Sequence, residues 1–167
     1  MLDTTDTSVG DRIRRFTEEA PGYYHRLLLV VGPFGSGKTA LLQQTAEALA
    51  APLLNVNLEL SRLLLDLTQR QRLLQLPRLM DEIVSAPGRD LVLLDNLEML
   101  FDRAFGQDPL ALIQNLSRNR TLIASWNGTL EGGWLVYGVS EHPEYRRYPT
   151  RELMILDLTQ HATHPAT

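Results

Sequence analysis

Short apolar runs alternate with stretches of helical periodicity along most of the chain. The apolar runs predict strands, and the stretches with apolar side chains every three or four residues predict helices. The expected strands are residues 26–31, 53–57, 90–94, 120–126 and 152–158. The expected helices are residues 39–50, 59–67, 77–85 and 108–117. This alternation is typical of an α/β fold with a mainly parallel five-stranded sheet that is buried on both faces.

Two segments interrupt this regular plan. A Gln/Arg-rich stretch, residues 68–76, is expected to link two helices. Residues 126–139 contain several glycines, which favour turns, so this segment is expected to form an extended loop or a hairpin inserted into the sheet plan.

The ends of the chain differ from its centre. Residues 1–20 have no apolar stretch of signal-peptide length and are interpreted as an N-terminal extension. Residues 21–159 form the predicted domain, and the small, polar residues 160–167 are expected to be a flexible tail. Because no apolar run approaches the roughly 20 residues of a membrane helix, we expect a cytoplasmic protein that does not contact membranes.

Composition narrows the chemistry. The 167 residues include no cysteine, which excludes disulfides, Cys-ligated metals and thiol catalysis. The 16 basic and 20 acidic residues leave a net charge of −4, so nucleic-acid binding is not indicated by overall charge. Fifteen of the basic residues are arginine, and Lys38 is the only lysine.

That lysine belongs to a phosphate-binding motif. Residues 32–39, GPFGSGKT, match the Walker A pattern G-x-x-x-x-G-K-[ST], with an expected strand before the motif and an expected helix after it. Glycines let the backbone turn its N–H groups toward phosphate oxygens, Lys38 can reach the β- and γ-phosphates, and the Thr39 hydroxyl can bind Mg²⁺. The motif predicts ATP and Mg²⁺ as cofactors. The expected nucleotide-binding residues are Gly32, Pro33, Phe34, Gly35, Ser36, Gly37, Lys38, Thr39 and Ala40.

A carboxylate at the end of another expected strand fits a Walker B role. Asp95 follows four apolar residues and is expected to hold Mg²⁺ together with Thr39. P-loop ATPases with an additional strand usually place glutamate directly after this aspartate, but here that residue is Asn96, which can orient water but cannot accept its proton. Glu98 can serve as the general base, or it is a surface residue or an inter-subunit contact. Since a missing base typically costs ~10²–10⁴ in rate, slow hydrolysis is expected.

The strand at 120–126 brings further polar candidates. If it lies between the strands that precede Lys38 and Asp95, Asn127 or Ser125 can sense the γ-phosphate or hold the attacking water. The alternative is that Asn127 caps its own turn with Gly128.

Arginines supply two further hypotheses. Arg118 or Arg120 can act as an arginine finger across a subunit boundary, or each is a solvated arginine or part of a salt bridge. Arg62, Arg70, Arg72 and Arg78 form a local basic excess that can contact DNA phosphates, or they are simply the exposed face of a helix.

Beyond Walker A, several motifs resemble one family. They are VGPFGSGKTALL, LLNVNLELSR, LVLLDNLEMLF, QDPLALIQNLSRNRTLIASW and HPEYRRY, within roughly residues 26–158. These motifs resemble the BrxF family, the small P-loop proteins of type 3 BREX bacteriophage-exclusion systems. The resemblance implies a bacterial ATPase that works with other BREX proteins in defence against phage. It also implies a three-layer fold similar to the AAA+ core, of the ASCE class, and Lys38, Thr39 and Asp95 as nucleotide and Mg²⁺ residues.

Three functions follow from these features. The first is a small ATPase or ATP-dependent switch that assembles into a homo-oligomer, because the chain is expected to lack the C-terminal helical lid and an arginine finger of its own. The second is a non-hydrolysing adaptor that uses ATP only for structure, as Asn96 suggests. The third is a nucleotide or small-molecule kinase, which would need a lid bearing arginines.

Overall fold

The computed structural model describes residues 4–139 and 141–159. Its sheet contains seven strands, two more than the sequence predicts. The central five run parallel in the order β2 (Leu53–Asn55), β3 (Leu91–Asp95), β4 (Thr121–Glu131), β1 (Leu27–Gly32) and β7 (Met154–Asp157). These are the five predicted strands, so the mainly parallel α/β class is confirmed.

The two additional strands come from the predicted insertion. β4 continues past Trp126 to Glu131, and the chain turns at Gly132 and Gly133, whose φ angles of 54° and 84° are left-handed. It returns antiparallel as β5 (Trp134–Tyr137), which pairs with β6 (Arg146–Pro149). The five-strand count was therefore wrong, because glycines at positive φ close a hairpin that the central strand itself extends.

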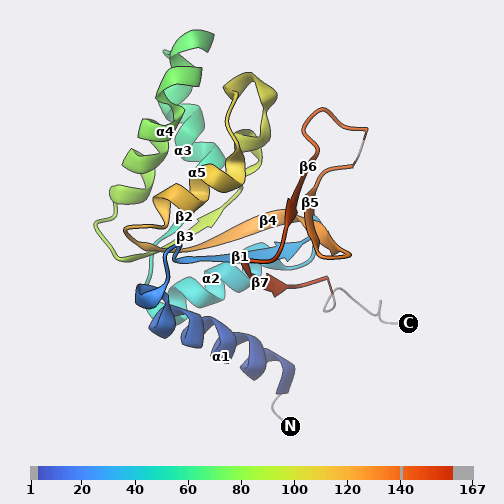
Figure 1. The fold of residues 1–167 in the computed structure, drawn as a ribbon. Helices are drawn as coiled ribbons and strands as arrows, with labels where there is room; N and C mark the ends of the chain where they lie inside the picture. Colours follow the sequence, from blue (N-terminus) through green and yellow to red (C-terminus); the bar gives the residue numbers. More distant parts are fainter. Residues whose placement is uncertain (1–3, 140, 160–167) are drawn as a thin grey trace.

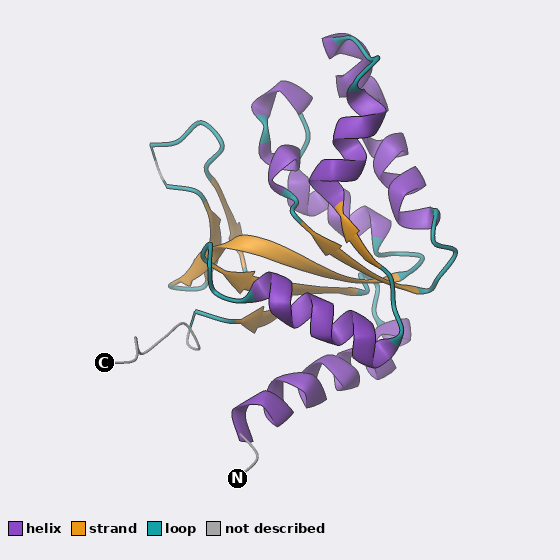
Figure 2. Ribbon diagram, turned by 180° about the vertical axis from the view of Figure 1, so that it is seen from behind, coloured by secondary structure: helices purple, strands orange, loops and turns teal. Residues whose placement is uncertain are grey.

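Helices cover both faces of the sheet, which gives three layers (Figures 1 and 2). α1 (Thr4–Glu19) and α2 (Lys38–Leu49) pack on one face. α3 (Val56–Leu64), α4 (Gln69–Ser85) and α5 (Pro109–Leu116) pack on the other. Three short 3₁₀ turns complete the described elements, at Ala20–Gly22, Glu98–Phe101 and Arg103–Phe105.

Strand β1 shows why both faces must be covered. All six of its residues are buried. Leu27, Leu29 and Val31 join the core under α3, α4 and α5. Leu28 and Val30 join the core under α1 and α2. Side chains of a strand point alternately to the two faces of the sheet, so a strand that is apolar at every position has no polar face to present to water.

Two local expectations were corrected. The Gln/Arg-rich stretch is not a link, because α4 begins at residue 69 rather than 77. Thr68 caps it: the Thr68 hydroxyl accepts from the Gln71 N–H, and the Gln71 side chain accepts from the Thr68 N–H. The expected strand 53–57 ends at Asn55, because the Asn55 side chain caps α3.

The N-terminal segment packs on the sheet. The segment interpreted as an N-terminal extension contains α1, whose Val9, Ile13 and Phe16 are buried against the sheet. The expected flexible tail, residues 160–167, lies outside the described residues. Among the described helices, none combines the length and apolar character needed to span a membrane.

Candidate functional site

The phosphate-loop motif connects β1 to α2 at the carboxyl edge of the sheet. β1 ends at Gly32, and α2 begins at Lys38. Gly35 and Gly37 have φ angles of 81° and 91°, which residues other than glycine rarely adopt. A Cβ atom at Gly32 would lie only 2.3 Å from Ser36 Oγ, so the loop folds back tightly over this glycine. The local glycines therefore impose the loop shape that the motif predicts.

Lys38 is turned into this loop. Its Nζ donates to the carbonyl oxygens of Gly32 at 2.8 Å and Pro33 at 2.7 Å, and to Ser36 Oγ at 3.3 Å. Burial lowers the pKa of Lys38, and the nearby carboxylates of Asp95 and Glu98 act in the opposite direction. The only lysine of the chain is thus a buried cation held by neutral oxygens that an anionic ligand could replace.

Asp95 ends β3 beside the loop and accepts three hydrogen bonds. The Thr39 hydroxyl donates to Oδ2 at 2.7 Å. The Ser125 hydroxyl donates to Oδ1 at 2.6 Å, and the Asn96 N–H donates to the same oxygen at 3.0 Å. Because Asp95 and Ser125 are both buried, the carboxylate is fixed in orientation.

The residue after Asp95 turns the chain. Asn96 has a φ angle of 56°, and its carbonyl accepts from the Asn57 N–H at 2.9 Å. Asparagine tolerates this left-handed conformation, whereas glutamate does not tolerate it well. Asn96 thus has a backbone role at the position where P-loop ATPases with an additional strand usually carry glutamate, and Glu98 follows at the start of a 3₁₀ turn.

Glu98 is held by two amide side chains. Asn57 Nδ2 donates to Oε2 at 2.8 Å, and Asn127 Nδ2 donates to Oε1. Asn57 Oδ1 also accepts from the Met99 N–H at 2.9 Å, which fixes the orientation of its amide group. Glu98 is therefore neither a free surface carboxylate nor remote from the loop.

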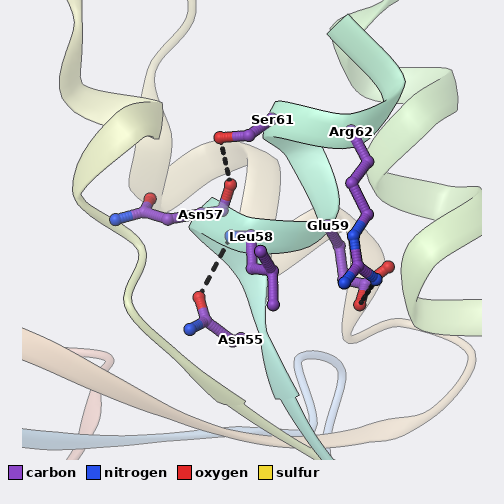
Figure 3. A network of polar contacts seen from close by, with 6 residues as sticks. All are labelled: Asn55, Asn57, Leu58, Glu59, Ser61 and Arg62. Atoms are coloured by element: carbon purple, nitrogen blue, oxygen red, sulfur yellow. Dashed lines mark hydrogen bonds and ion pairs between the residues drawn. The ribbon is translucent and has the colours of Figure 1, made fainter. Parts of the chain in front are cut away.

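The start of α3 positions Asn57 (Figure 3). Asn55 caps the helix by accepting from the Leu58 N–H at 3.1 Å, and the Ser61 hydroxyl donates to the Asn57 carbonyl at 2.7 Å. The Asn57 side chain points away from Leu58 and Arg62, toward the segment after β3 (Figure 3). Sequence reasoning missed this residue, although its place at the end of the expected strand 53–57 was the available signal.

These side chains line one cleft of about 350 Å³. Its walls bring together most of the predicted site residues and both expected carboxylates. They are Phe34, Gly35, Gly37, Lys38, Thr39, Ala40, Asp95, Asn96, Glu98 and Asn127. The topology explains the gathering, because β4 lies between β1 and β3, so Asn127 within β4 lies beside Gly32 at the end of β1, next to the end of β3.

The two candidate arginines lie elsewhere. Arg118 and Arg120 precede β4 and so occupy the amino edge, opposite the cleft. Arg120 donates to the Val84 carbonyl at 2.7 Å and to Ser85 Oγ at 3.1 Å, at the C-terminal end of α4. Arg118 lies over the Tyr24 ring at 4.7 Å from its centroid. Among the residues that line the cleft, Lys38 is the only cation.

The donor set fits a hard divalent cation. A hydroxyl at Thr39 and a carboxylate at Asp95 are oxygen ligands of the kind Mg²⁺ takes, and Mg²⁺ keeps several waters rather than requiring a full protein cage. No cluster of three or more His, Asp or Glu side chains that could hold a metal occurs within residues 4–139 and 141–159. Thr39 and Asp95 therefore fit a Mg²⁺ ion that binds together with a phosphate ligand. They fit a structural metal, which needs more protein ligands, less well.

Comparisons with known proteins add little to what the geometry of the cleft shows. No protein-family model and no curated protein matches the chain. It is similar to the solved structure of C. elegans PCH-2, with a TM-score of 0.49 and 20% identity. That likeness covers 79% of this chain, which spans 40% of the length of the PCH-2 chain. Membership of the BrxF family stays a prediction from the sequence motifs.

Proposed function

We propose that this protein is a P-loop ATPase or ATP-dependent switch that binds ATP with Mg²⁺. One observation carries the proposal: Lys38 and Thr39 of a Gly-rich strand-to-helix loop share a cleft with Asp95, Glu98 and Asn127. The insertion of β4 between β1 and β3 supports the ASCE class of P-loop proteins, which the sequence predicts.

Each residue has a role that its position allows. Backbone N–H groups of the loop and the N-terminus of α2 can receive phosphate oxygens. Lys38 Nζ can exchange the Gly32 and Pro33 carbonyls for the β- and γ-phosphates. Asp95, oriented by Ser125, and the Thr39 hydroxyl would hold Mg²⁺, which when bound neutralises phosphate charge and orients the reacting group.

Hydrolysis needs a base for the attacking water. The water oxygen attacks the γ-phosphorus, the bond to the β,γ-bridging oxygen breaks to release ADP, and a base takes the water proton. Glu98 is the available carboxylate, and Asn127 is placed to orient the water. Because both oxygens of Glu98 accept amide hydrogen bonds, we expect slow turnover until one amide is released.

Engagement of Glu98 also favours a second candidate function, the non-hydrolysing adaptor. In that case ATP stabilises one conformation, and Glu98 only links α3 to β4 through Asn57 and Asn127. The resemblance to the BrxF family supports action in a bacterial phage-defence complex under either function. Other BREX proteins are the proposed partners, and DNA contact through Arg62, Arg70, Arg72 and Arg78 is a further proposal.

Nucleotide binding tests the proposal directly. Titration with a fluorescent ATP analogue should give saturable, Mg²⁺-dependent binding, and Lys38→Ala should weaken binding by at least about 100-fold, because a buried charge-assisted contact is lost. Arg118→Ala, at the amino edge, is the matched control and should bind normally. Equal affinity of Lys38→Ala and the wild type would refute the assignment of the loop. Phosphate release that Glu98→Gln abolishes would establish the ATPase over the adaptor.

A further inference from the structure

The turn that carries Glu98 is anchored in an aromatic cluster. Glu98 begins the 3₁₀ turn Glu98–Phe101, and the Phe101 side chain at its end is buried. A 3₁₀ helix has three residues per turn, so residues three positions apart lie one above the other. Glu98 and Phe101 therefore lie on the same side of this turn, and a displacement of the Phe101 ring is transmitted to the Glu98 carboxylate.

The Phe101 ring packs on aromatic side chains of the β4–β5 hairpin. It is stacked on Tyr137 of β5, with centroids 3.5 Å apart and an angle of 9° between the ring planes. It meets Trp126 of β4 edge to face, with centroids 5.1 Å apart and an angle of 83°. Trp126 in turn contacts Tyr148 of β6 edge to face at 5.7 Å. Edge-to-face pairs stabilise beyond the area that they bury, so these rings fix the 3₁₀ turn to the hairpin.

A hydrogen bond and a close backbone approach hold the hairpin itself. Trp126 Nε1 donates to the Val136 carbonyl at 3.2 Å in a buried position. Gly128 of β4 pairs with Tyr137 of β5, and a Cβ atom at Gly128 would lie only 1.8 Å from the Val136 oxygen. Because only glycine allows the two strands to approach this closely, Tyr137 has a fixed place opposite the residue that follows Asn127.

The same hairpin also reaches Glu98 directly. Asn127, between Trp126 and Gly128, donates from its side-chain amide to Glu98 Oε1. Arg103, in the next 3₁₀ turn, donates from Nε to the Pro143 carbonyl in the loop between β5 and β6. The segment after β3 therefore meets the hairpin at the carboxylate, at the Phe101 ring and at Arg103.

We propose that Phe101 and Tyr137 are positioning residues for Glu98, because their stack fixes the 3₁₀ turn on the β4–β5 hairpin and so places the carboxylate in the cleft. Neither ring lines the cleft itself. The placement can be measured without nucleotide, and its effect on hydrolysis rests on the proposed function. A displacement of about 1 Å can lower a rate by about 100-fold, so the hairpin controls turnover from outside the cleft.

Loss of the stack differs from loss of one amide contact to Glu98. Without the stack, the turn moves and the base is displaced as a whole, which lowers turnover. Without the Asn57 amide, the turn stays in place and only one carboxylate oxygen is freed. The two kinds of variant are therefore expected to change turnover in opposite directions.

Two truncations and two controls isolate the stack. Tyr137→Leu and Phe101→Leu each remove one of its rings, whereas Tyr137→Phe keeps the ring and removes only the hydroxyl. Phe16→Leu is the matched control, because Phe16 is also buried but belongs to α1 on the opposite face of the sheet. Thermal unfolding followed by circular dichroism confirms the fold of each variant. Tyr137→Met, with a flexible apolar side chain, replaces Tyr137→Leu if that variant unfolds.

The first measurement follows the contact between Asn127 and Glu98 in the protein without nucleotide. In a ¹H–¹⁵N correlation spectrum, the Asn127 side-chain amide is identified by its absence from the spectrum of Asn127→Asp. Its protons should exchange slowly with solvent in the wild type, Tyr137→Phe and Phe16→Leu, because the amide is bonded to Glu98. Exchange should be at least about tenfold faster in Tyr137→Leu and Phe101→Leu. Equal exchange rates in all five proteins would overturn the proposal.

Turnover is the second measurement. Tyr137→Leu should lower kcat for phosphate release at least about tenfold and leave the affinity for a fluorescent ATP analogue within about twofold, because the phosphate loop is untouched. Tyr137→Phe should keep the kcat of the wild type. An unchanged kcat in Tyr137→Leu, or an equal loss in Phe16→Leu, would also overturn the proposal. A wild type that releases no phosphate would refute hydrolysis and not the placement of Glu98, which the exchange rates decide.

Discussion

The Ser125 hydroxyl donates a 2.6 Å hydrogen bond to Oδ1 of Asp95. Ser125 is buried on β4, and Asp95 ends the neighbouring strand β3. Groups that orient a metal ligand typically contribute 10–100-fold to metal affinity. Ser125→Ala should therefore raise the Mg²⁺ concentration for half-maximal binding of a fluorescent ATP analogue by about tenfold, and Ser125→Thr should restore most of the loss.

Ser117→Ala is the control for this prediction. The Ser117 hydroxyl is also buried, but it donates to the Gln114 carbonyl at 2.7 Å, at the amino edge. An unchanged Mg²⁺ requirement in Ser125→Ala, or an equal change in Ser117→Ala, would contradict an orienting role for Ser125.

A second prediction concerns the amide that holds Glu98. Asn57→Ala removes the hydrogen bond to Oε2 and leaves that oxygen free to accept a water proton, so ATP turnover should rise by about three- to tenfold with little change in ATP affinity. Steady-state phosphate release measures the change. The double variant Asn57→Ala, Glu98→Gln should be as inactive as Glu98→Gln.

Ser61→Ala is suited as its control, because Ser61 contacts the Asn57 carbonyl and leaves the side-chain amide in place. Turnover that falls or stays constant in Asn57→Ala would show that this amide does not restrain the base.

The third prediction concerns the left-handed turn after Asp95. Asn96→Ala should lower the free energy of unfolding by about 1 kcal/mol, because Cβ without a polar group is strained at positive φ. Asn96→Gly should stay within about 0.5 kcal/mol of the wild type. Urea denaturation of the three proteins checks both values.

Ala50 offers a complementary test of the same strain. It ends α2 at a φ angle of 50°, so Ala50→Gly should stabilise the protein by about 0.5 kcal/mol. Equal stability of Asn96→Ala and Asn96→Gly would mean that the turn conformation stores no strain.

The fourth prediction follows from Tyr137 in the core beside the cleft. Its ring stacks on Phe101 at 3.5 Å between centroids, and burial, followed by the charges of Glu98 and Glu144, raises its pKa to about 12. The folded protein therefore keeps Tyr137 neutral where the unfolded chain, with a pKa near 10, releases the proton. This contribution to stability is complete below pH 10 and is lost as the pH rises from about 10 to 12.

Melting temperatures measured from pH 8 to 11.5 test whether the ionisation of Tyr137 lowers stability as the pH rises. Tyr137→Phe cannot ionise, so its stability should decline less than that of the wild type above about pH 10, whereas Tyr24→Phe, at an exposed position, should follow the wild type. Parallel pH curves for Tyr137→Phe and the wild type would contradict the prediction.

Local chemistry in the sequence was sufficient to predict the core of the fold and the tight turn of the Gly-rich loop before α2. Runs such as Leu27–Gly32 are apolar at every position, which only a sheet covered on both faces accommodates. The shape of the loop depends on Gly32, Gly35 and Gly37, which lie within six residues. Interactions between residues that are close in the sequence can be predicted from residue types alone.

Only the tertiary structure shows which residues far apart in the sequence meet in the cleft. Asn57 and Glu98 are 41 positions apart, and Asn127 is 29 positions further along. Their side chains meet because β3, which precedes Glu98, pairs with β2 on one side and with β4 on the other. Arg118 and Arg120 carry the charge that a phosphate site needs, but the parallel direction of β4 puts them at the opposite edge from Lys38. Residue type shows what a side chain can do, and strand order and direction determine which other side chains it meets.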